Sequence, residues 1–433
     1  MDFLLKTDVA AEERPHAAPD RRPRSLAETG VRESVLEDIA LKNLYLRGPF
    51  SVVELARQMR LSYDVAELLF SRLRAKVLCE VTGMRANVPE IAITSSGRTR
   101  ALELLAASQY AGAAPISLES YVEQVRRQRA LPRDIRAIDV ERAFAHLVFD
   151  PETLAQFGTA LNSAAPIFLY GPPGVGKTAA AEALSRVLAS DEVWIPYAVE
   201  IDGQIVTVFD PVIHKPAADE PGGGRPADRD ERWVLCQRPT VMVGGELTIE
   251  MLDLQFHPVT RYYDGPPQMK ANNGVLIIDD FGRQRIQPED LLNRWVVPLD
   301  RRIEFLTMVG GRKIEIPFEM LVVFATNLDP AQTLDAAFLR RIQTKIHIGA
   351  ASEAQFTAIF YRVAAERDLE VSETALRELI AVICDGLHEE LRPCHPRDLI
   401  NQVCWAARYE GRKPKLDRSS LLRAVRTYFV SAG

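Results

Sequence analysis

The middle of the chain alternates between short apolar runs and longer segments with helical periodicity. The clearest runs are of strand length and lie at 166–170, 274–278 and 321–325. The first is followed by a glycine-rich turn and then by an Ala-rich helical segment at 179–189. Continuous apolar runs of this length are typical of parallel strands that are buried on both faces. The pattern therefore predicts an α/β protein with a parallel sheet core.

The last eighty residues have helical periodicity throughout, in about four amphipathic segments. They predict a small helical lid domain over 351–433. The expected helices lie at 352–366, 372–388, 396–408 and 418–430.

The first part of the chain has a different organisation. Residues 1–30 are rich in Pro, Arg, Ala and Glu without periodicity, which predicts a disordered tail. Residues 31–107 have the element order of a winged helix, an α+β domain. Residues 108–134 are interpreted as a linker that contains one helix, at 118–128. The winged-helix elements are expected at 34–46, 52–59 and 62–73 (helices), 77–81 and 91–94 (strands), and from Ser96 (helix).

A winged helix can read DNA or dock a protein, and the charge balance bears on that choice. Arg72, Arg74 and Lys76 lie where the third helix would contact phosphates. However, residues 31–107 hold eleven Lys and Arg against nine Asp and Glu, a balance of only +2. This weak positive charge favours protein docking, and DNA reading stays open as the alternative.

Composition restricts the setting of the protein. Its net charge is −6 and 47% of its residues are hydrophobic, values of an ordinary soluble protein. No apolar run approaches the roughly 20 residues of a membrane span, so no membrane insertion is expected. Five cysteines without a C-x-x-C pair favour a reducing, cytoplasmic location over a disulfide framework. Cys394 and His395 have no second metal-binding half nearby, so no zinc is expected.

The turn after the first strand carries the strongest chemical signal. It matches G-x-x-x-x-G-K-[ST] between a strand and a helix, the context that this motif requires. Its glycines let the backbone wrap a phosphate chain at a helix N-terminus. Its lysine can reach the β- and γ-phosphates, and its threonine hydroxyl can bind Mg²⁺. We therefore expect ATP and Mg²⁺ as ligands. The residues are Gly171, Pro172, Pro173, Gly174, Val175, Gly176, Lys177 and Thr178.

The other two apolar strands also end in polar residues. The second delivers Asp279, expected to hold Mg²⁺ through water, and Asp280, placed to polarise an attacking water. The third ends before Asn327, which can orient that water. Because open α/β sheets bind ligands at the carboxyl edge of their strands, these three residues are expected to meet the glycine-rich turn there.

In combination, these landmarks resemble an AAA+ ATPase over residues 135–433, with a nucleotide-binding domain at 135–350 followed by the lid. A β-hairpin at 302–316 with a Gly310-Gly311 turn is similar to the pre-sensor-1 insertion of the MoxR-like branch. The resemblance implies that Asn327 is sensor 1. It also implies that Arg341, with Arg340 second, is an arginine finger, and that Arg397 in the 394–398 stretch is sensor 2.

An arginine finger that completes a neighbour's site requires an oligomer. The resemblance thus implies a homo-oligomer, commonly a hexameric ring, that remodels a protein partner, with the 308–311 tip facing a central pore. One position departs from the family, which usually has Glu where this chain has Asp280. The shorter side chain would place its carboxylate about 1 Å further from the water and slow hydrolysis.

Three functions follow from this reading. The first is an ATP-driven remodeller of a protein partner or assembly, in which the winged helix serves as adaptor. The second is an ATP-controlled DNA-binding regulator or loader. The third is a switch that binds ATP without hydrolysing it. The charge balance of residues 31–107 favours the first.

Overall fold

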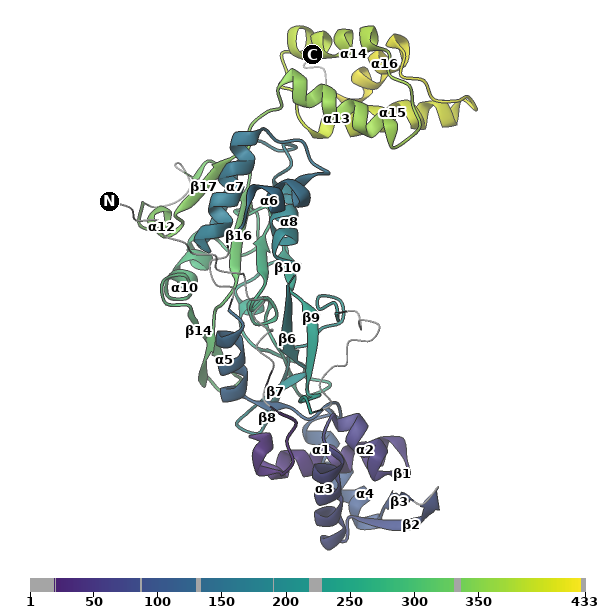
Figure 1. Ribbon diagram of the computed structural model, residues 1–433, viewed down its shortest axis with the longest axis vertical. Helices are drawn as coiled ribbons and strands as arrows, with labels where there is room; N and C mark the ends of the chain where they lie inside the picture. The colour runs from purple at the N-terminus through teal and green to yellow at the C-terminus, as the bar shows by residue number, and fades with distance from the viewer. Residues whose placement is uncertain are drawn as a thin grey trace, which may run out of the picture.

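The computed structural model describes residues 19, 21–85, 88–129, 134–189, 191–217, 228–330 and 336–429. The molecule is elongated, with the C-terminal helices at one end and the N-terminal helices at the other (Figure 1). Two sheets lie between these ends, one that carries the glycine-rich turn and one closer to the N-terminal helices.

The first sheet is the parallel sheet that the sequence predicts. In space its strands follow the order β10-β13-β16-β5-β17, and every neighbouring pair is parallel. The apolar runs form its three central strands, so that part of the prediction is confirmed. The strands are β10 (Thr240–Val243), β13 (Val275–Ile278), β16 (Leu321–Thr326), β5 (Ile167–Tyr170) and β17 (Thr344–His347).

Helices cover both faces of this sheet, which explains why its strands are apolar throughout. Alternate residues point to opposite faces. Ile277 and Val323 pack on one side with α6 (Ala137–Phe144), α7 (Pro151–Ser163) and α8 (Lys177–Leu188). On the other side, Leu276 and Phe324 pack with Trp295 of α10 (Pro288–Arg301).

The second sheet is mixed and was not predicted. Its strand order is β11-β12-β8-β7-β4, and a separate antiparallel pair, β6 and β9, shares its core. The stretch 192–207 holds three strands, β6 to β8. The bounds are β4 (Ile116–Ser117), β6 (Glu192–Pro196), β7 (Ala198–Ile201), β8 (Gln204–Thr207), β9 (Trp233–Gln237), β11 (Gln255–Phe256) and β12 (Tyr263–Asp264), with η2 (Glu250–Leu252) and α9 (Pro267–Lys270) close by in the chain.

The predicted hairpin is present as β14 (Ile303–Thr307) and β15 (Lys313–Pro317). Its apolar face is buried in the core of the second sheet, where Leu306 and Ile316 lie. At the tip Met308 is buried, whereas Val309 is 70% exposed. Only part of the 308–311 turn is therefore available to contact another molecule.

The N-terminal region has the expected order of elements, with one addition. Three helices, two strands and a fourth helix occur in the predicted order, and the short β1 adds a strand beside β3. The two strands span 79–85 and 88–93, whereas they were expected at 77–81 and 91–94. Whether this region acts as a winged helix stays a prediction. The bounds are α1 (Glu33–Arg47), β1 (Phe50–Ser51), α2 (Val52–Met59), α3 (Tyr63–Ala75), β2 (Cys79–Arg85), β3 (Val88–Ile93) and α4 (Ser95–Ala107).

Two segments that were expected to be loose are packed. Residues 21–30 include η1 (Ala27–Thr29) and the buried Leu26 and Thr29, so the tail boundary at 30 falls inside a packed segment. The expected linker contains β4 and α5 (Leu118–Arg127), whose Tyr121 is 1% exposed in the core of the second sheet. Amphipathicity alone did not reveal this packing, because the partner residues lie far away in the sequence.

The insertion at 211–230, between β8 and β9, is described only in part. His214 is fully buried, its Nε2 lies 2.9 Å from the carbonyl oxygen of Lys270, and its Nδ1 accepts the Asp210 N–H at 2.8 Å. Residues 218–227 lie outside the described part of the chain, as do 1–18 and 20. The described part of this insertion thus belongs to the packed body.

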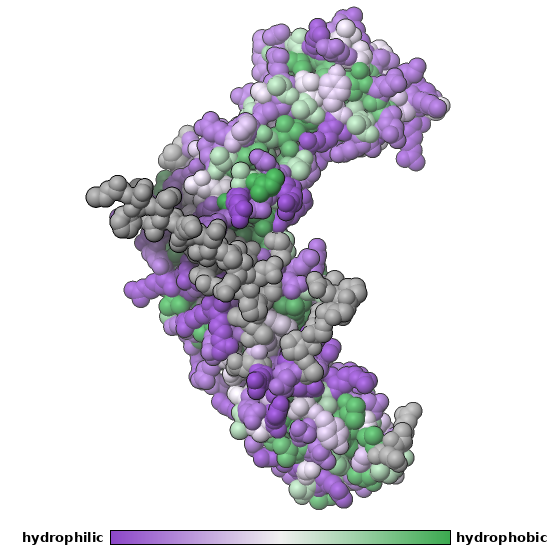
Figure 2. Space-filling view, viewed as in Figure 1, coloured by the Kyte–Doolittle hydropathy of each residue, from purple (hydrophilic) through white to green (hydrophobic). Residues whose placement is uncertain are grey.

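The C-terminal helices form a separate bundle with its own core, as expected. They are α13 (Glu353–Ala365), α14 (Glu373–Ala381) continued by the π-helical η3 (Val382–Gly386), α15 (Cys394–Tyr409) and α16 (Arg418–Tyr428). The short α12 (Ala336–Arg341) precedes β17. Polar side chains dominate the face of the molecule seen in Figure 2. Among the described residues, no helix is both long and apolar enough to span a membrane.

Candidate nucleotide-binding site

Three loops meet at the carboxyl edge of the parallel sheet. The first begins at Gly171 after β5, the second holds Asp279 and Asp280 after β13, and the third starts with Asn327 after β16. Because β16 pairs with both β5 and β13, its loop lies between the other two. The sheet order therefore brings together residues that are more than a hundred positions apart in the sequence.

The glycine-rich turn needs glycine for two separate reasons. Gly171, Gly174 and Gly176 all have positive φ values, of 147°, 81° and 94°. A side chain at Gly171 would also place its Cβ 2.0 Å from the carbonyl oxygen of Ile348, and one at Gly174 would lie 2.6 Å from Cys394 Sγ. The backbone of the turn thus packs closely against Ile348 and Cys394, and this packing fixes its path up to the start of α8.

Lys177 is the centre of the site. Its Nζ donates to the carbonyl oxygens of Gly171 and Pro172 at 3.0 and 2.7 Å, and to Asn327 Oδ1 at 2.6 Å. Partial burial lowers the pKa of Lys177, while the carboxylates of Asp280 and Asp279 act in the opposite direction. The ammonium group thus stands inside the turn, where it can bind a phosphate oxygen as a point charge.

Two further contacts complete the network. The Thr178 hydroxyl donates to Asp279 Oδ2 at 2.9 Å, and Asn327 Nδ2 donates to Asp280 Oδ1 at 3.2 Å. Hydroxyl and carboxylate oxygens are the hard donors that Mg²⁺ prefers, so the first pair fits a magnesium site. The second pair links the exposed carboxylate of Asp280 through Asn327 to Lys177. A carboxylate in this position can orient a water molecule next to a bound phosphate.

The C-terminal bundle contacts the glycine-rich turn through Cys394, which lies in the predicted 394–398 stretch, and through Arg392, which sequence reasoning missed. The Cys394 N–H donates to the carbonyl oxygen of Gly174 at 3.2 Å. Arg392 Cδ lies 3.6 Å from the Cβ position of Gly174, and Arg392 Nε is buried without a hydrogen-bond partner among the described residues. Arg397, the predicted lid arginine, is exposed, and its Nε donates to Asp398 Oδ1 at 3.2 Å. The structure therefore offers Arg392 as a second candidate for this role.

The predicted arginine finger lies at the other edge of the same sheet. Arg340 and Arg341 end α12 just before β17, whose first residue, Thr344, pairs with Ile167 at the start of β5. Parallel strands carry their amino ends at one edge, so both arginines are a full strand length from Gly171. They are not brought to the site of their own chain.

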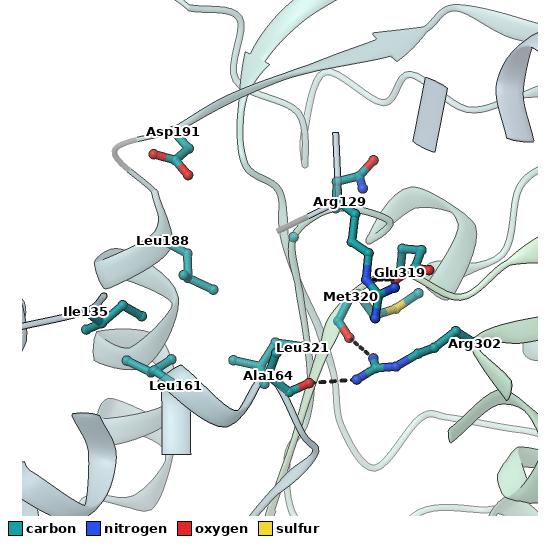
Figure 3. A pocket seen from close by; sticks show the side chains of 12 residues that line it. Arg129, Ile135, Leu161, Ala164, Leu188, Asp191, Arg302, Glu319, Met320 and Leu321 are labelled. Carbon is teal, nitrogen blue, oxygen red and sulfur yellow. Dashed lines mark hydrogen bonds and ion pairs between the residues drawn. The ribbon is translucent and has the colours of Figure 1, made fainter. Parts of the chain in front are cut away.

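A pocket also opens at this amino edge. It is lined by apolar residues such as Leu161, Leu188 and Leu321, and by Arg129 and Arg302 (Figure 3). The two arginines are engaged at its wall. Arg129 Nε lies 3.1 Å from Glu319 Oε2, and Arg302 Nη2 donates to the carbonyl oxygen of Ala164 at 2.7 Å. This pocket is distinct from the glycine-rich turn.

Among the described residues, no group of three or more His, Cys, Asp or Glu lies close enough to hold a metal ion. His395 is buried, and burial together with the Arg392 charge lowers its pKa to about 4. It packs on the rings of Tyr428 and Phe429. His395 is thus a neutral residue of the lid core.

Comparison with known proteins gives limited likenesses. A family model described as a domain of unknown function (DUF8689) matches residues 352–427, the lid helices. A search of curated protein sequences found no significant match.

Similar solved structures include NtrX from Brucella abortus in complex with ADP, at 14% identity and a TM-score of 0.40; the match covers 65% of this chain and 56% of that one. This chain thus spans little more than half of the NtrX chain. The RuvB Holliday junction branch migration motor of Thermotoga maritima matches at 15% identity over 65% of this chain and 70% of that one, with a TM-score of 0.37. The AAA domain of FIGL-1 matches at 14% over 70% and 80%, with a TM-score of 0.34.

Proposed function

We propose that this protein is an AAA+ ATPase that hydrolyses ATP with Mg²⁺ at the interfaces of a homo-oligomeric ring. The observation that carries the proposal is the hydrogen-bonded chain from Lys177 through Asn327 to Asp280, beside the Thr178–Asp279 pair. It joins a phosphate-binding lysine, a magnesium-type donor set and an exposed carboxylate at one sheet edge.

Each residue has a separate role in the proposed reaction. The turn at 171–176 and Lys177 bind the phosphate chain. Thr178 and Asp279 would hold Mg²⁺, which would supply positive charge to the phosphates. Asp280, oriented by Asn327, accepts a proton from the attacking water. Arg341 of a neighbouring subunit, with Arg340 second, stabilises charge on the transferred phosphoryl group.

The position of Arg341 supports the need for an oligomer. Within one chain it lies at the amino edge of the sheet, and the turn lies at the carboxyl edge. A subunit that stacks its amino edge on the next subunit's carboxyl edge completes the site, and repetition of this heterologous contact closes a ring. We propose a ring of six subunits.

We propose a protein, and not DNA, as the partner that the ring remodels. Two of the three basic side chains expected to contact phosphates, one on α3 and one directly after it, pair with acidic residues of α1. Arg72 pairs with Glu33 and Glu37, and Lys76 Nζ lies 2.5 Å from Glu37 Oε2. Phosphate binding would have to break these pairs, so a salt-dependent affinity for duplex DNA is disfavoured.

The test compares three single variants for ATP binding and turnover across a range of protein concentrations, with assembly size measured in parallel. Lys177→Ala should weaken ATP binding at least tenfold. Asp280→Asn should bind ATP as wild type does but lower turnover by about 100-fold, a typical loss for a general base. Arg341→Ala should bind ATP, assemble, and lose turnover to a similar extent.

The alternatives predict different results. A non-hydrolysing switch would bind ATP tightly through Lys177 yet show no turnover at any concentration. A DNA-controlled enzyme would shift duplex DNA at low salt and lose that shift as salt rises. Turnover that is equal in dilute monomer and in Arg341→Ala would contradict a site shared between subunits.

A further inference from the structure

We propose that Asp300 is a positioning residue for Arg341, holding its guanidinium in the orientation that a neighbouring subunit's nucleotide meets. This inference rests on the proposed function, because it assigns a partner to the finger of that function. Arg341 Nε donates to Asp300 Oδ2 at 3.1 Å. Asp300 lies in the last turn of α10, and Arg341 ends α12, so the bond joins two helices across 41 positions of sequence.

The nitrogen that makes this bond is informative. Arginine carries five N–H groups in a planar fork, and Nε lies at the base of that plane. A carboxylate that accepts from Nε restricts rotation of the guanidinium plane about the side chain. The direction in which the two terminal nitrogens point is then fixed by the fold. Arg341 and Asp300 are 30% and 49% exposed at their side chains. An ion pair this exposed contributes about 0–1 kcal/mol to folding, so stability is a weak reason for it.

The end of α10 is held firmly, which makes Asp300 a suitable anchor. The Arg302 N–H caps the helix by donating to the carbonyl oxygen of Pro298 at 3.0 Å, and Arg302 takes a left-handed φ of 58°. Its guanidinium then donates to the carbonyl oxygens of Ala164 and Met320 at 2.7 and 3.1 Å, just before β5 and β16 (Figure 3). Asp300 thus stands on a helix end fastened to the sheet.

The surroundings fit an anionic ligand from outside the chain. Asp300, Arg302, Arg340 and Arg341 line an open groove of about 590 Å³ at the amino edge of the sheet. Three arginines and one carboxylate are among its lining residues, so the groove is positive overall, and its volume is in the range of small-molecule sites. A bound triphosphate of the adjacent subunit has the matching charge.

The same helix begins close to the subunit's own acidic pair. α10 starts at Pro288, eight residues after Asp280, and runs for 14 residues to Arg301. A helix of that length spans about 21 Å. A single helix therefore runs from the loop that follows Asp280 to Asp300, the anchor of the arginine that serves the next subunit.

The experiment uses full-length protein and mixed assemblies. Asp300→Asn should lower kcat for ATP at least tenfold while KM changes less than twofold, because the variant's own phosphate-binding turn is intact. Asp300→Glu, which keeps the carboxylate, should recover part of the loss. Asp368→Asn, which changes an exposed aspartate of the lid at a left-handed position where Asn is tolerated, is the matched control and should leave kcat unchanged.

Assemblies mixed from two variants distinguish a defect in the neighbouring subunit's site from a defect in the subunit's own site. Asp300→Asn subunits mixed with Lys177→Ala subunits should regain turnover, because each Lys177→Ala subunit supplies an intact Arg341 to a neighbour's functional turn. If the mixture stays inactive while Arg341→Ala with Lys177→Ala recovers, Asp300 acts in its own site and the inference is wrong. If neither mixture recovers, the shared site of the proposed function fails. An Asp300→Asn variant with wild-type kcat overturns the inference alone.

Discussion

At the scale of single residues, the site is built from short side chains on constrained backbone. Asp280 has a left-handed φ of 49°, a conformation that Asp tolerates better than longer residues because its short side chain can bond locally. Its Oδ1 is met by Asn327 Nδ2, so the carboxylate is already oriented. The short side chain of Asp280 thus suits the left-handed backbone at this position better than the longer Glu would. Sequence comparison alone did not indicate this.

A second residue with unusual chemistry lies outside the site. Glu304 on β14 is 2% exposed, and burial raises its pKa to about 7 although Arg294 Nε donates to its Oε1 at 3.2 Å. Its Oε2 and the neighbouring amide oxygen, Gln268 Oε1, both lack hydrogen-bond partners among the described residues.

This residue predicts a pH dependence of folding. Because the folded-state pKa of Glu304 lies above its unfolded value near 4.5, the folded protein binds the extra proton and stability falls as pH rises from about 4.5 to 7. The loss is on the order of 3 kcal/mol. Urea unfolding at pH 5.5 and 8.0 should show a larger drop for wild type than for Glu304→Gln. Equal drops in both proteins would exclude Glu304 as the cause.

At the scale of elements, the clearest finding is that α5 is a structural helix. Tyr121 is 1% exposed, and its hydroxyl accepts from Asn272 Nδ2 at 2.8 Å. Gln128, directly after α5, donates through Nε2 to the carbonyl oxygen of Trp194 at 2.7 Å. The helix thus joins the second sheet to the segment before β13, and residues 118–128 cannot act as a flexible connection.

This packing predicts a large effect of a single truncation. Tyr121→Ala should lower the free energy of unfolding by about 3–5 kcal/mol, because it removes a fully buried ring and leaves Asn272 without one partner. Tyr409→Ala, at a side chain that is 93% exposed, should stay within about 0.5 kcal/mol. Urea unfolding followed by fluorescence measures both. Similar changes in the free energy of unfolding for the two variants would mean that the packing of α5 against the second sheet does not stabilise the fold.

At the scale of the whole molecule, the N-terminal region is fastened to the second sheet and its surroundings. Arg232 lies at the centre of this contact, with 5% of its side chain exposed. It binds Asp230 through Nε and Nη2, and its Nη1 donates to the carbonyl oxygens of Thr29 and Pro115 at 2.8 and 3.0 Å. The elongated arrangement in Figure 1 is therefore supported by a buried ion pair at this joint.

Removal of this arginine should loosen the joint. Arg232→Ala leaves the Asp230 carboxylate buried and unpaired, a change that typically costs about 3–5 kcal/mol. We expect amide hydrogen exchange over residues 21–36 to become at least tenfold faster, with ATP affinity unchanged. Arg47→Ala, at an exposed arginine of α1, is the control and should leave exchange unchanged. Unaltered exchange in Arg232→Ala would show that other contacts hold the region.

The sequence by itself determined the elements that depend on local pattern. Continuous apolar runs predicted β5, β13 and β16, because strands covered on both faces must be apolar along their whole length. The glycine spacing predicted the turn before Lys177, since that backbone conformation admits few other residues. Periodicity predicted the lid helices and those of the N-terminal region.

The polar residues after the apolar strands predicted that Asp279, Asp280 and Asn327 meet the glycine-rich turn. Only the tertiary structure decided their order and the remaining contacts between distant residues. Strand order placed Asn327 between Lys177 and Asp280, and it put Arg341 at the opposite edge of the sheet. Chain folding brought Arg392 against Gly174 and buried α5 in the second sheet. None of these contacts leaves a local signal, because an arginine or an amphipathic helix has the same pattern whether it faces solvent or a partner from elsewhere in the chain.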